Sequence, residues 1–423
     1  MLRAEDNERL VRVGPGTPGG ELLRRYWTPA LLSSELPERD GAPVRVRLLC
    51  EDLIAFRDST GAVGLVDAHC PHRRAPMFFG RNEDCGLRCV YHGWKFDRHG
   101  ACVDMPSEPA GTPLQAKVKI KAYPTYEAGG IVWTYMGPEA QRPAPPDYEW
   151  MRAPETHRFV SRTIEDCNYL QALEGGLDTA HSSFAHNNDL GNKNLVRTRD
   201  TAPTLEVEQT DYGYSYISTR RVSESRHYVR VYHYVMPAQQ MRGAISALDG
   251  NLREIPEIDG HIWVPIDDET TNVYNWGYAY DTGYPIDPAH ALEREVYAGR
   301  GPQHFIPGTF RLSANLGNDY FIDRGVQKTR TFTGIPGVNT QDFALQEGMG
   351  KIVDRSQEFL GTSDKAIVAM RRLMLEAIRD VEQGLSPRGS DPSHSSHIRP
   401  YDNVVDHHHD WRKSFAPELK AKW

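Results

Sequence analysis

Alternating hydrophobic and polar positions predict β-strands in the first third of the chain. Between residues 44 and 48, two valines and a leucine alternate with arginines, which is the two-residue period of a strand with one buried face. The apolar segments 54–56 and 63–66 flank a Ser-Thr-Gly sequence, a combination typical of a hairpin turn. Another apolar run at 131–135 completes a region that we expect to be rich in β-structure.

Helical patterns mark three other segments. Residues 5–13 predict a short N-terminal helix, and residues 167–184 resemble a helix in the middle of the chain. Between residues 367 and 381 the apolar side chains recur at helical spacing, which places them on one helix face. Ser363 stands where a serine caps a helix, and Gly384 stands where a glycine ends one.

The proline-rich segment 138–146 has the composition of a linker, and we place a domain boundary there. A chain of 423 residues exceeds the usual size of one hydrophobic core, so two domains are expected. After the linker, alternating strands are expected between residues 212 and 236, mixed with helices, while the tail after Pro387 is polar and irregular. The predicted parts are residues 1–145, 146–390 and 391–423.

Composition and charge exclude several classes of protein. With 39% hydrophobic and 25% charged residues, the chain resembles an ordinary soluble globular protein. A net charge of -8 argues against nucleic acid as a partner, because phosphate binding needs a basic surface. No apolar run approaches the roughly 20 residues that span a bilayer. The first residues lack the apolar core of a signal peptide, so we expect a cytoplasmic protein.

Two short motifs carry the first candidate metal site. Cys70-Pro71-His72 is followed, after 16 residues, by Cys89-Val90-Tyr91-His92. Two thiolates and two imidazoles suit either tetrahedral zinc or a Rieske [2Fe–2S] cluster, in which both histidines bind one iron. Zinc sites of this composition usually pair Cys with Cys and His with His. Here each motif offers one Cys and one His, which favours the cluster.

A second candidate site lies between residues 168 and 186, where Asp178, His181 and His186 occur close together. Two histidines and a carboxylate form the facial triad of non-haem Fe(II) oxygenases, although paired histidines are also common as structural residues. Asp178 and His181 are three positions apart and would share a helix face, whereas His186 would turn away from it. We therefore predict that the helix breaks or bulges after His181.

Both motifs and their flanking residues resemble the α-subunits of Rieske non-haem iron oxygenases over essentially the whole chain. The resemblance is carried by CPHR at 70–73, by CVYHGWKFD at 89–97 and by NYLQALEGGLDTAHSSFAH at 168–186. The chain most resembles the phthalate dioxygenase branch, which works without a β-subunit. This implies an α+β fold, with an N-terminal all-β Rieske domain and a C-terminal helix-grip (START-like) catalytic domain of antiparallel sheet and helices.

The resemblance also implies a role for each candidate residue. The ligands of the cluster would be Cys70, His72, Cys89 and His92. A mononuclear Fe(II) would be held by His181, His186 and a distant acid. Asp342, in the segment TQDFALQEG at 340–348, takes the position of that acid, with Glu347 and Asp354 as alternatives.

The same resemblance implies a ring of subunits. Asp178 would join His181 to His92 of the neighbouring subunit in a homotrimer or a stacked hexamer. Electrons would come from a separate NAD(P)H-dependent reductase, with or without a ferredoxin. The chain itself has no plant-type ferredoxin cysteine spacing, and its one Gly-x-Gly-x-x-Gly sequence, at 14–19, follows no predicted strand.

The substrate is the least determined part of the hypothesis. An aromatic carboxylate is implied, and Arg226, Arg230 and Arg242 are candidates to clamp it, with surface strand positions as the alternative. Among the reactions we lean towards O-demethylation of a methoxylated, lignin-derived aromatic acid. Monohydroxylation and cis-dihydroxylation of a phthalate-type dicarboxylate are the alternatives. More distant possibilities are a Rieske electron carrier and a ligand-binding module.

Overall fold

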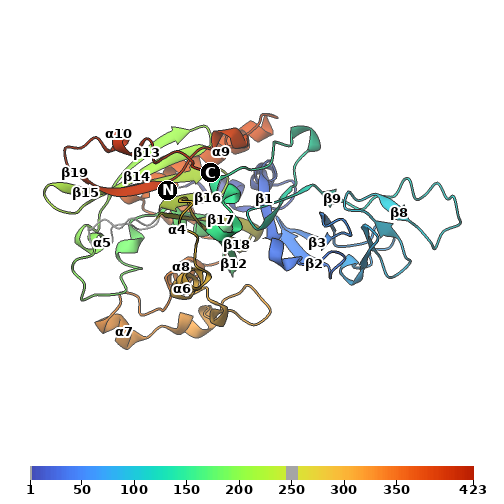
Figure 1. The fold of residues 1–423 in the computed structure, drawn as a ribbon, viewed down its shortest axis with the longest axis horizontal. Helices are drawn as coiled ribbons and strands as arrows, with labels where there is room; N and C mark the ends of the chain where they lie inside the picture. Colours follow the sequence, from blue (N-terminus) through green and yellow to red (C-terminus); the bar gives the residue numbers. More distant parts are fainter. Residues whose placement is uncertain (1, 244–255) are drawn as a thin grey trace.

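The molecule is elongated, with a small β-rich lobe that projects from a larger lobe of sheet and helices (Figure 1). The computed structural model describes residues 2–243 and 256–423. This two-part α+β arrangement confirms the fold class that the sequence predicts.

Two four-stranded antiparallel sheets form the projecting lobe, in the orders β2-β3-β4-β9 and β5-β6-β7-β8. The strands are β2 (Val44–Leu48), β3 (Glu51–Arg57), β4 (Val63–Asp67), β5 (Arg81–Glu83), β6 (Gly86–Arg88), β7 (Lys95–Phe96), β8 (Cys102–Asp104) and β9 (Ala122–Tyr123). The predicted hairpin is confirmed, because β3 and β4 pair antiparallel. Gly61 adopts a φ of 92° in the turn, where a side chain would be strained.

A three-stranded sheet, in the order β1-β11-β10, lies at the junction of the two lobes. Its strands are β1 (Trp27–Leu32), β10 (Thr125–Ala128) and β11 (Ile131–Tyr135). All five residues of β11 are buried, which explains why this strand reads as a continuous apolar run in the sequence.

The larger lobe is organised around an antiparallel sheet of eight strands within the described residues, in the order β12-β18-β17-β16-β15-β14-β13 with β19 added beside β15. The strands are β12 (Arg158–Glu165), β13 (Thr204–Thr210), β14 (Gly213–Arg221), β15 (Arg226–Val235), β16 (Gln239–Gly243), β17 (Glu257–Asp267), β18 (Thr270–Ala279) and β19 (Tyr401–Asp406). The expected strands between residues 212 and 236 are β14 and β15.

The C-terminal tail is ordered, and our expectation of an irregular segment after Pro387 was wrong. β19 pairs with the first half of β15, from Arg226 opposite Asp406 to Val231 opposite Tyr401. A short helix, α10 (Trp411–Phe415), follows it. The strand lacks apolar alternation because its order comes from pairing with a strand far away in the sequence, which local patterns do not reveal.

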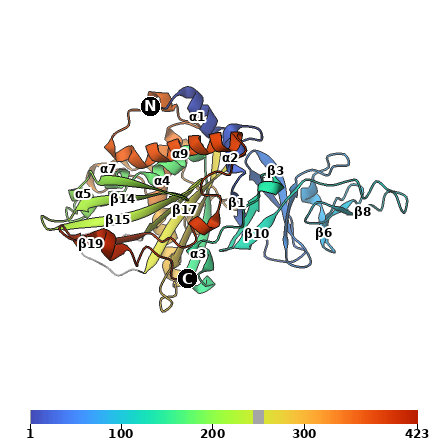
Figure 2. The same ribbon diagram turned by 90° about the horizontal axis from the view of Figure 1, so that it is seen from above.

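Helices cover the sheet and also form a separate group beside it. They are α1 (Ala4–Val11), α2 (Pro18–Leu23), α3 (Glu149–Arg152), α4 (Tyr169–Leu177), α5 (Val196–Arg199), α6 (Pro288–Ala298), α7 (Arg324–Thr329), α8 (Val338–Gly348) and α9 (Lys365–Glu382). In Figure 2, α9 and α1 lie along one face of the large sheet. Helices α6, α7 and α8 lie on the opposite side in Figure 1, and α8 contacts α4.

The predicted amphipathic helix near the C-terminus is α9, but its cap differs from the prediction. Asp364 occupies the N-cap position without a side-chain hydrogen bond, and Ser363 belongs to the preceding turn. Gly384 follows the helix with a φ of 77°, as a helix-ending glycine does.

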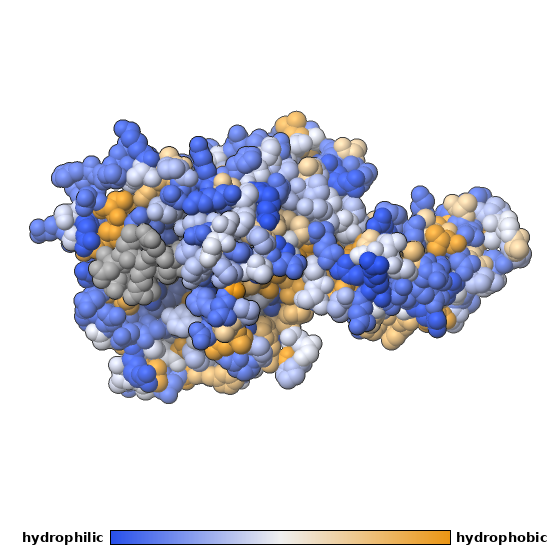
Figure 3. All heavy atoms as spheres, viewed as in Figure 1, coloured by the Kyte–Doolittle hydropathy of each residue, from blue (hydrophilic) through white to orange (hydrophobic). Residues whose placement is uncertain are grey.

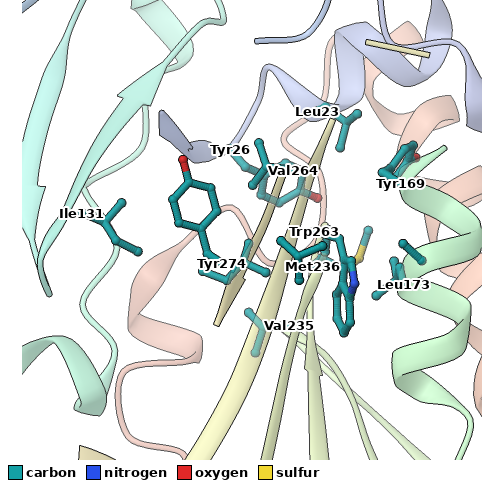
Figure 4. Close-up of a cluster of buried hydrophobic side chains, with 14 of the residues drawn as sticks. Leu23, Tyr26, Ile131, Tyr169, Leu173, Val235, Met236, Trp263, Val264 and Tyr274 are labelled. Carbon is teal, nitrogen blue, oxygen red and sulfur yellow. The ribbon is translucent and has the colours of Figure 1, made fainter. Parts of the chain in front are cut away.

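The main core lies where α4, the large sheet and the N-terminal segment meet (Figure 4). Leu173 of α4 and Trp263 of β17 point toward one another there, and both are at least 95% buried. Burying such a side chain stabilises the fold by about 1.5–3 kcal/mol. This core therefore holds α4 firmly against the sheet.

The face of the molecule seen in Figure 3 is mainly hydrophilic, with scattered apolar patches on both lobes. Across the described ranges 2–243 and 256–423, no helix has the length and apolar character required to cross a membrane.

Candidate metal centres and active-site cavity

The two Cys-x-His and Cys-x2-His motifs occupy tight turns at one end of the projecting lobe. The amide of Arg74 donates to the Cys70 carbonyl, and the amide of Gly93 donates to the Cys89 carbonyl, each at 2.9 Å. These turns bring the His72 and His92 rings together, with ring centroids 4.5 Å apart. All four predicted ligands of the cluster border one small space.

The residues at these turns fit a Rieske cluster. The Cys70 and Cys89 side chains are buried, and burial raises the pKa of the Cys70 thiol to about 11, so a thiolate there needs positive charge beside it. His72 Nδ1 is buried without a hydrogen-bond partner, as expected of an atom that binds a metal. The Trp94 ring stacks on His72 at a centroid distance of 4.3 Å and fixes its plane.

The second site begins where α4 ends. Helix α4 stops at Leu177, and Asp178 is its C-cap residue with an extended backbone (φ -71°, ψ 123°). His181 then starts a short 3-10 turn, His181–Ser183. The break that we predicted after His181 therefore lies before it, and Asp178 and His181 do not share a helix. The predicted helix over 167–184 is correspondingly shorter, because the chain turns to bring both histidines inward.

The two histidines and Asp342 converge on one point. The Nε2 atoms of His181 and His186 are 3.0 Å apart, and Asp342 Oδ1 lies 3.6 and 3.3 Å from them. Asp342 comes from α8, so the group joins segments far apart in the sequence. Together the three side chains offer ligand atoms within 4.8 Å of one another. Two imidazoles and one carboxylate are the donor set that suits non-haem Fe(II).

A hydrogen bond to Gln341 orients the His186 ring. His186 Nδ1 lies 2.9 Å from Oε1 of Gln341, and the Gln341 amide nitrogen donates to Asn188 and to the Ile335 carbonyl. Sequence reasoning missed Gln341, although it directly precedes Asp342. A buried amide beside a ligand has no periodic signature, so only its neighbour in the sequence could have indicated it.

Asp178 lies against His181 from the other side. Its Oδ2 is 3.5 Å from His181 Nδ1, and its Oδ1 accepts a hydrogen bond from the Ala180 amide at 2.7 Å. Burial raises the pKa of Asp178, but the contacts with His181 and Ala180 outweigh burial and leave that pKa below its ordinary value. Asp178 is thus ionised and orients the imidazole.

The two alternative acids occupy other positions. Glu347 accepts hydrogen bonds from the Asp166 amide and from the Tyr320 hydroxyl. Asp354 is exposed and caps the next short helical turn through the Ser356 amide. Neither belongs to the converging group of His181, His186 and Asp342.

A cavity of about 500 Å³ opens onto this site and is rich in arginine. Its wall includes His181, His186 and Asp342 and six arginines, namely Arg197, Arg220, Arg230, Arg242, Arg294 and Arg300. Of the three arginines proposed from the sequence, Arg230 and Arg242 line the cavity. Arg226 is exposed at the start of β15 and lies outside it, because the strand carries it beyond the cavity rim.

The arginines differ in how well they are neutralised. Arg242 forms an ion pair with Asp259 at 2.6 Å. By contrast, within the described part of the chain no carboxylate pairs with Arg197 or Arg230, and the buried Nε atom of each has no hydrogen-bond partner. Burial lowers the pKa of Arg197, and repulsion from Arg230 lowers it further. Sequence reasoning missed Arg197, which lies on the short helix α5.

Aromatic residues divide between the cavity and the core. The Tyr232 ring lines the cavity and lies 4.7 Å from the Arg230 guanidinium carbon. Tyr234, Met236 and Met241 are buried in the main core.

Comparison with known proteins agrees with this geometry. Residues 26–124 match the Rieske [2Fe-2S] domain, and residues 134–422 match the family described as LigXa C-terminal domain like. The chain is 40% identical to the phthalate 4,5-dioxygenase oxygenase subunit of Pseudomonas putida, over 97% of this chain and 94% of that protein. It is 36% identical to the 5,5'-dehydrodivanillate O-demethylase oxygenase subunit of a Sphingobium species, over 92% of this chain and 83% of that protein.

Solved structures show the same fold at low sequence identity. Dicamba monooxygenase bound to dicamba is 19% identical, with a TM-score of 0.62 over 86% of this chain and 99% of that chain. The two family matches cover both lobes and show, with the phthalate 4,5-dioxygenase relative, that the chain is an oxygenase subunit that carries a Rieske cluster. The protein belongs to the Rieske non-haem iron oxygenases, as an oxygenase α-subunit of the phthalate dioxygenase-like branch.

Proposed function

We propose that this oxygenase subunit oxidises an aromatic dicarboxylate by cis-dihydroxylation. The observation that carries the proposal is the pair of arginines, Arg197 and Arg230, that face the cavity without a carboxylate partner among the described residues. A buried cation without a counter-ion is costly, and an anionic substrate removes that cost. Arg220 of the same wall donates to the Ser183 hydroxyl and to the Thr179 and Asp200 carbonyls. The two arginines whose Nε atom has no partner among the described residues therefore favour a substrate with two carboxylates.

The cavity also suits the rest of such a substrate. Tyr232, Trp263 and Phe343 supply apolar wall near the converging histidines, and an aromatic ring fits between apolar and aromatic side chains. The arginines would hold the carboxylates through charge-assisted hydrogen bonds. This arrangement would fix the ring beside the iron site and exclude water from it.

We further propose the ligand sets that the geometry supports. Cys70, His72, Cys89 and His92 would hold the cluster, and His181, His186 and Asp342 would hold the iron. When bound, the cluster supplies single electrons and the ferrous ion offers open positions for oxygen. The electrons come from a reductase partner.

The choice of reaction reverses the preference drawn from the sequence alone. O-demethylation of a methoxylated aromatic acid becomes the second candidate, supported by the likeness to 5,5'-dehydrodivanillate O-demethylase. Dihydroxylation is favoured because the phthalate 4,5-dioxygenase subunit is more similar and is matched over nearly its full length.

A single-turnover experiment tests the proposal. The metal-loaded protein is chemically reduced, exposed to oxygen with phthalate isomers or methoxylated aromatic acids, and the products are identified by mass spectrometry. We expect a cis-dihydrodiol from a dicarboxylate. Formaldehyde and a new phenol would instead establish O-demethylation, and turnover restricted to uncharged aromatics would contradict the anionic substrate.

A matched pair of variants tests the arginine. Arg230→Met should raise the KM for a dicarboxylate about tenfold to a hundredfold, since a hydrogen bond to a charged group contributes about 1.5–3 kcal/mol. Arg226→Met removes an exposed arginine from the same strand and should leave KM unchanged. Equal effects of the two substitutions would show that Arg230 does not contact the substrate.

A further inference from the structure

Glu165 is a buried acid at the end of β12, in the wall of the cavity that contains the iron site. Its side chain is 0% exposed. Within the described part of the chain no cation pairs with Glu165, and its one side-chain hydrogen bond is a long contact of 3.4 Å from the Cys167 thiol to Oε1. Oε2 has no partner at all among these residues.

A carboxylate in this environment would be an uncompensated buried charge, which is strongly unfavourable. The neutral acid avoids that cost, and its O–H group is then free to donate. The charged groups around Glu165 also mainly favour its neutral form. Burial raises the pKa of Glu165 well above its ordinary value, and repulsion from Glu347 and Asp166 raises it further, against a smaller opposing effect of the Cys167 contact.

The reaction of this family needs protons in the cavity. cis-Dihydroxylation consumes one O2, two electrons and two protons, and both oxygen atoms remain on the substrate as hydroxyl groups. O-demethylation consumes the same reactants and gives a phenol, formaldehyde and water. An aromatic substrate that fills the cavity displaces water, so a proton source fixed in the wall has an advantage over solvent.

We propose that Glu165 is a proton donor for oxygen reduction in this cavity. Its O–H bond breaks, the bonding electron pair stays on the carboxylate, and the proton forms a new O–H bond on the oxygen that is being reduced. The two electrons come from the reductase through the cluster. Bulk solvent that enters when product leaves supplies, from hydronium, both the proton that restores Glu165 and the second proton that the reaction consumes. The role requires only oxygenase activity, so it holds for either candidate substrate.

Glu165 is distinct from the iron-site residues. No hydrogen bond or ion pair joins it to His181, His186 or Asp342 among the described residues. It differs also from Glu347, whose two oxygens both accept hydrogen bonds. Glu165 thus differs from Glu347 in having a carboxyl oxygen, Oε2, without a hydrogen-bond partner among the described residues.

The protonation state is tested first, by infrared spectroscopy of the full-length, metal-loaded protein near neutral pH. We expect a C=O stretch of a protonated carboxylic acid that disappears in Glu165→Gln and persists in Glu347→Gln. Glutamine keeps the size of the side chain, so packing is retained, and cluster and iron contents serve as the check on folding. A spectrum unchanged by Glu165→Gln would overturn the proposal.

The role in the reaction is tested by single-turnover kinetics. In Glu165→Gln, product formation should slow at least a hundredfold, the usual range for loss of a general acid, and part of the oxygen should appear as hydrogen peroxide. The wild-type solvent isotope effect on product formation should change in the variant. An unchanged rate and product yield would show that Glu165 is only a neutral packing residue. Failure of the dicarboxylate proposal would leave both tests valid with another substrate.

Discussion

At the scale of single residues, the iron site depends on side chains that touch its histidines. Gln341 is fully buried, and its amide group connects His186 to Asn188 and to the Ile335 carbonyl. Because one ring nitrogen of His186 is held by this amide, the other is directed at His181 and Asp342. Such outer partners typically contribute tenfold to a hundredfold in metal affinity.

Gln341→Met keeps a side chain of similar length but removes the oxygen that meets His186. We expect iron affinity to fall about tenfold to a hundredfold, measured by titration of the apoprotein with ferrous ion. The cluster absorbance should stay unchanged, since the cluster lies in the other lobe. Gln357→Met, at an exposed glutamine, is the control. Equal iron affinity in both variants would mean that Gln341 does not orient His186.

At the scale of elements, close packing of the end of α4 against its neighbours positions Asp178 and His181, which follow this helix. Two glycines in the last turn of α4 make this approach possible. A Cβ atom added at Gly176 would lie 2.1 Å from the buried ring of Trp263, and one added at Gly175 would lie 1.9 Å from the amide nitrogen of Gln346. The first neighbour is a rigid ring in the core, whereas the second is the free end of a flexible side chain.

Gly176→Ala should lower the free energy of unfolding by about 1–3 kcal/mol, because overpacking against Trp263 outweighs the helix preference of alanine. Gly175→Ala is the matched control one residue away, and rotation of Gln346 should make it nearly neutral. Denaturant unfolding measures both changes. If Gly176→Ala were as stable as the control, the close packing of α4 would not matter to the site.

The sequence predicted elements where the apolar pattern is local and missed those that depend on distant contacts. The hairpin of β3 and β4 follows from alternation and a glycine turn. β19 was missed because its pairing with β15 joins residues that lie far apart in the chain. At the site, the Cys and His spacings indicated two metal centres. The partners Gln341 and Arg197 were missed because their importance comes only from where the fold places them.

At the scale of the whole molecule, the two candidate metal sites occupy different lobes of one chain. Figures 1 and 2 show β8, which belongs to the same sheet as β6 and β7 beside the cluster motifs, at the far end of the projecting lobe from α4. Electron transfer within one chain would have to cross much of its length. We propose that the cluster of one subunit serves the iron of its neighbour in a ring, with His92 of one chain near Asp178 of the next.

Exposed apolar side chains occur at both ends of the proposed contact. Val90 and Tyr91 are exposed beside the cluster turn, while Leu345 and Met349 are exposed on and after α8, which carries Asp342. Head-to-tail contacts between such different surfaces close into rings. A homotrimer, single or stacked as a hexamer, is the assembly that this arrangement favours.

Mixing two inactive variants decides between transfer within and between subunits. His92→Ala removes a proposed cluster ligand, and His181→Ala removes a proposed iron ligand, so neither homo-oligomer should turn over. The chains are unfolded together and reassembled in equal amounts. A junction between two neighbouring subunits then supports turnover when the intact cluster of one subunit faces the intact iron site of the next. In random rings that occurs at about one junction in four, so activity should recover to about a quarter of the wild-type value per chain. Transfer confined to one chain predicts no recovery, because every chain in the mixture lacks one of the two centres. Retention of the remaining metal and of ring size in each variant ensures that a negative result reflects the electron path rather than lost assembly.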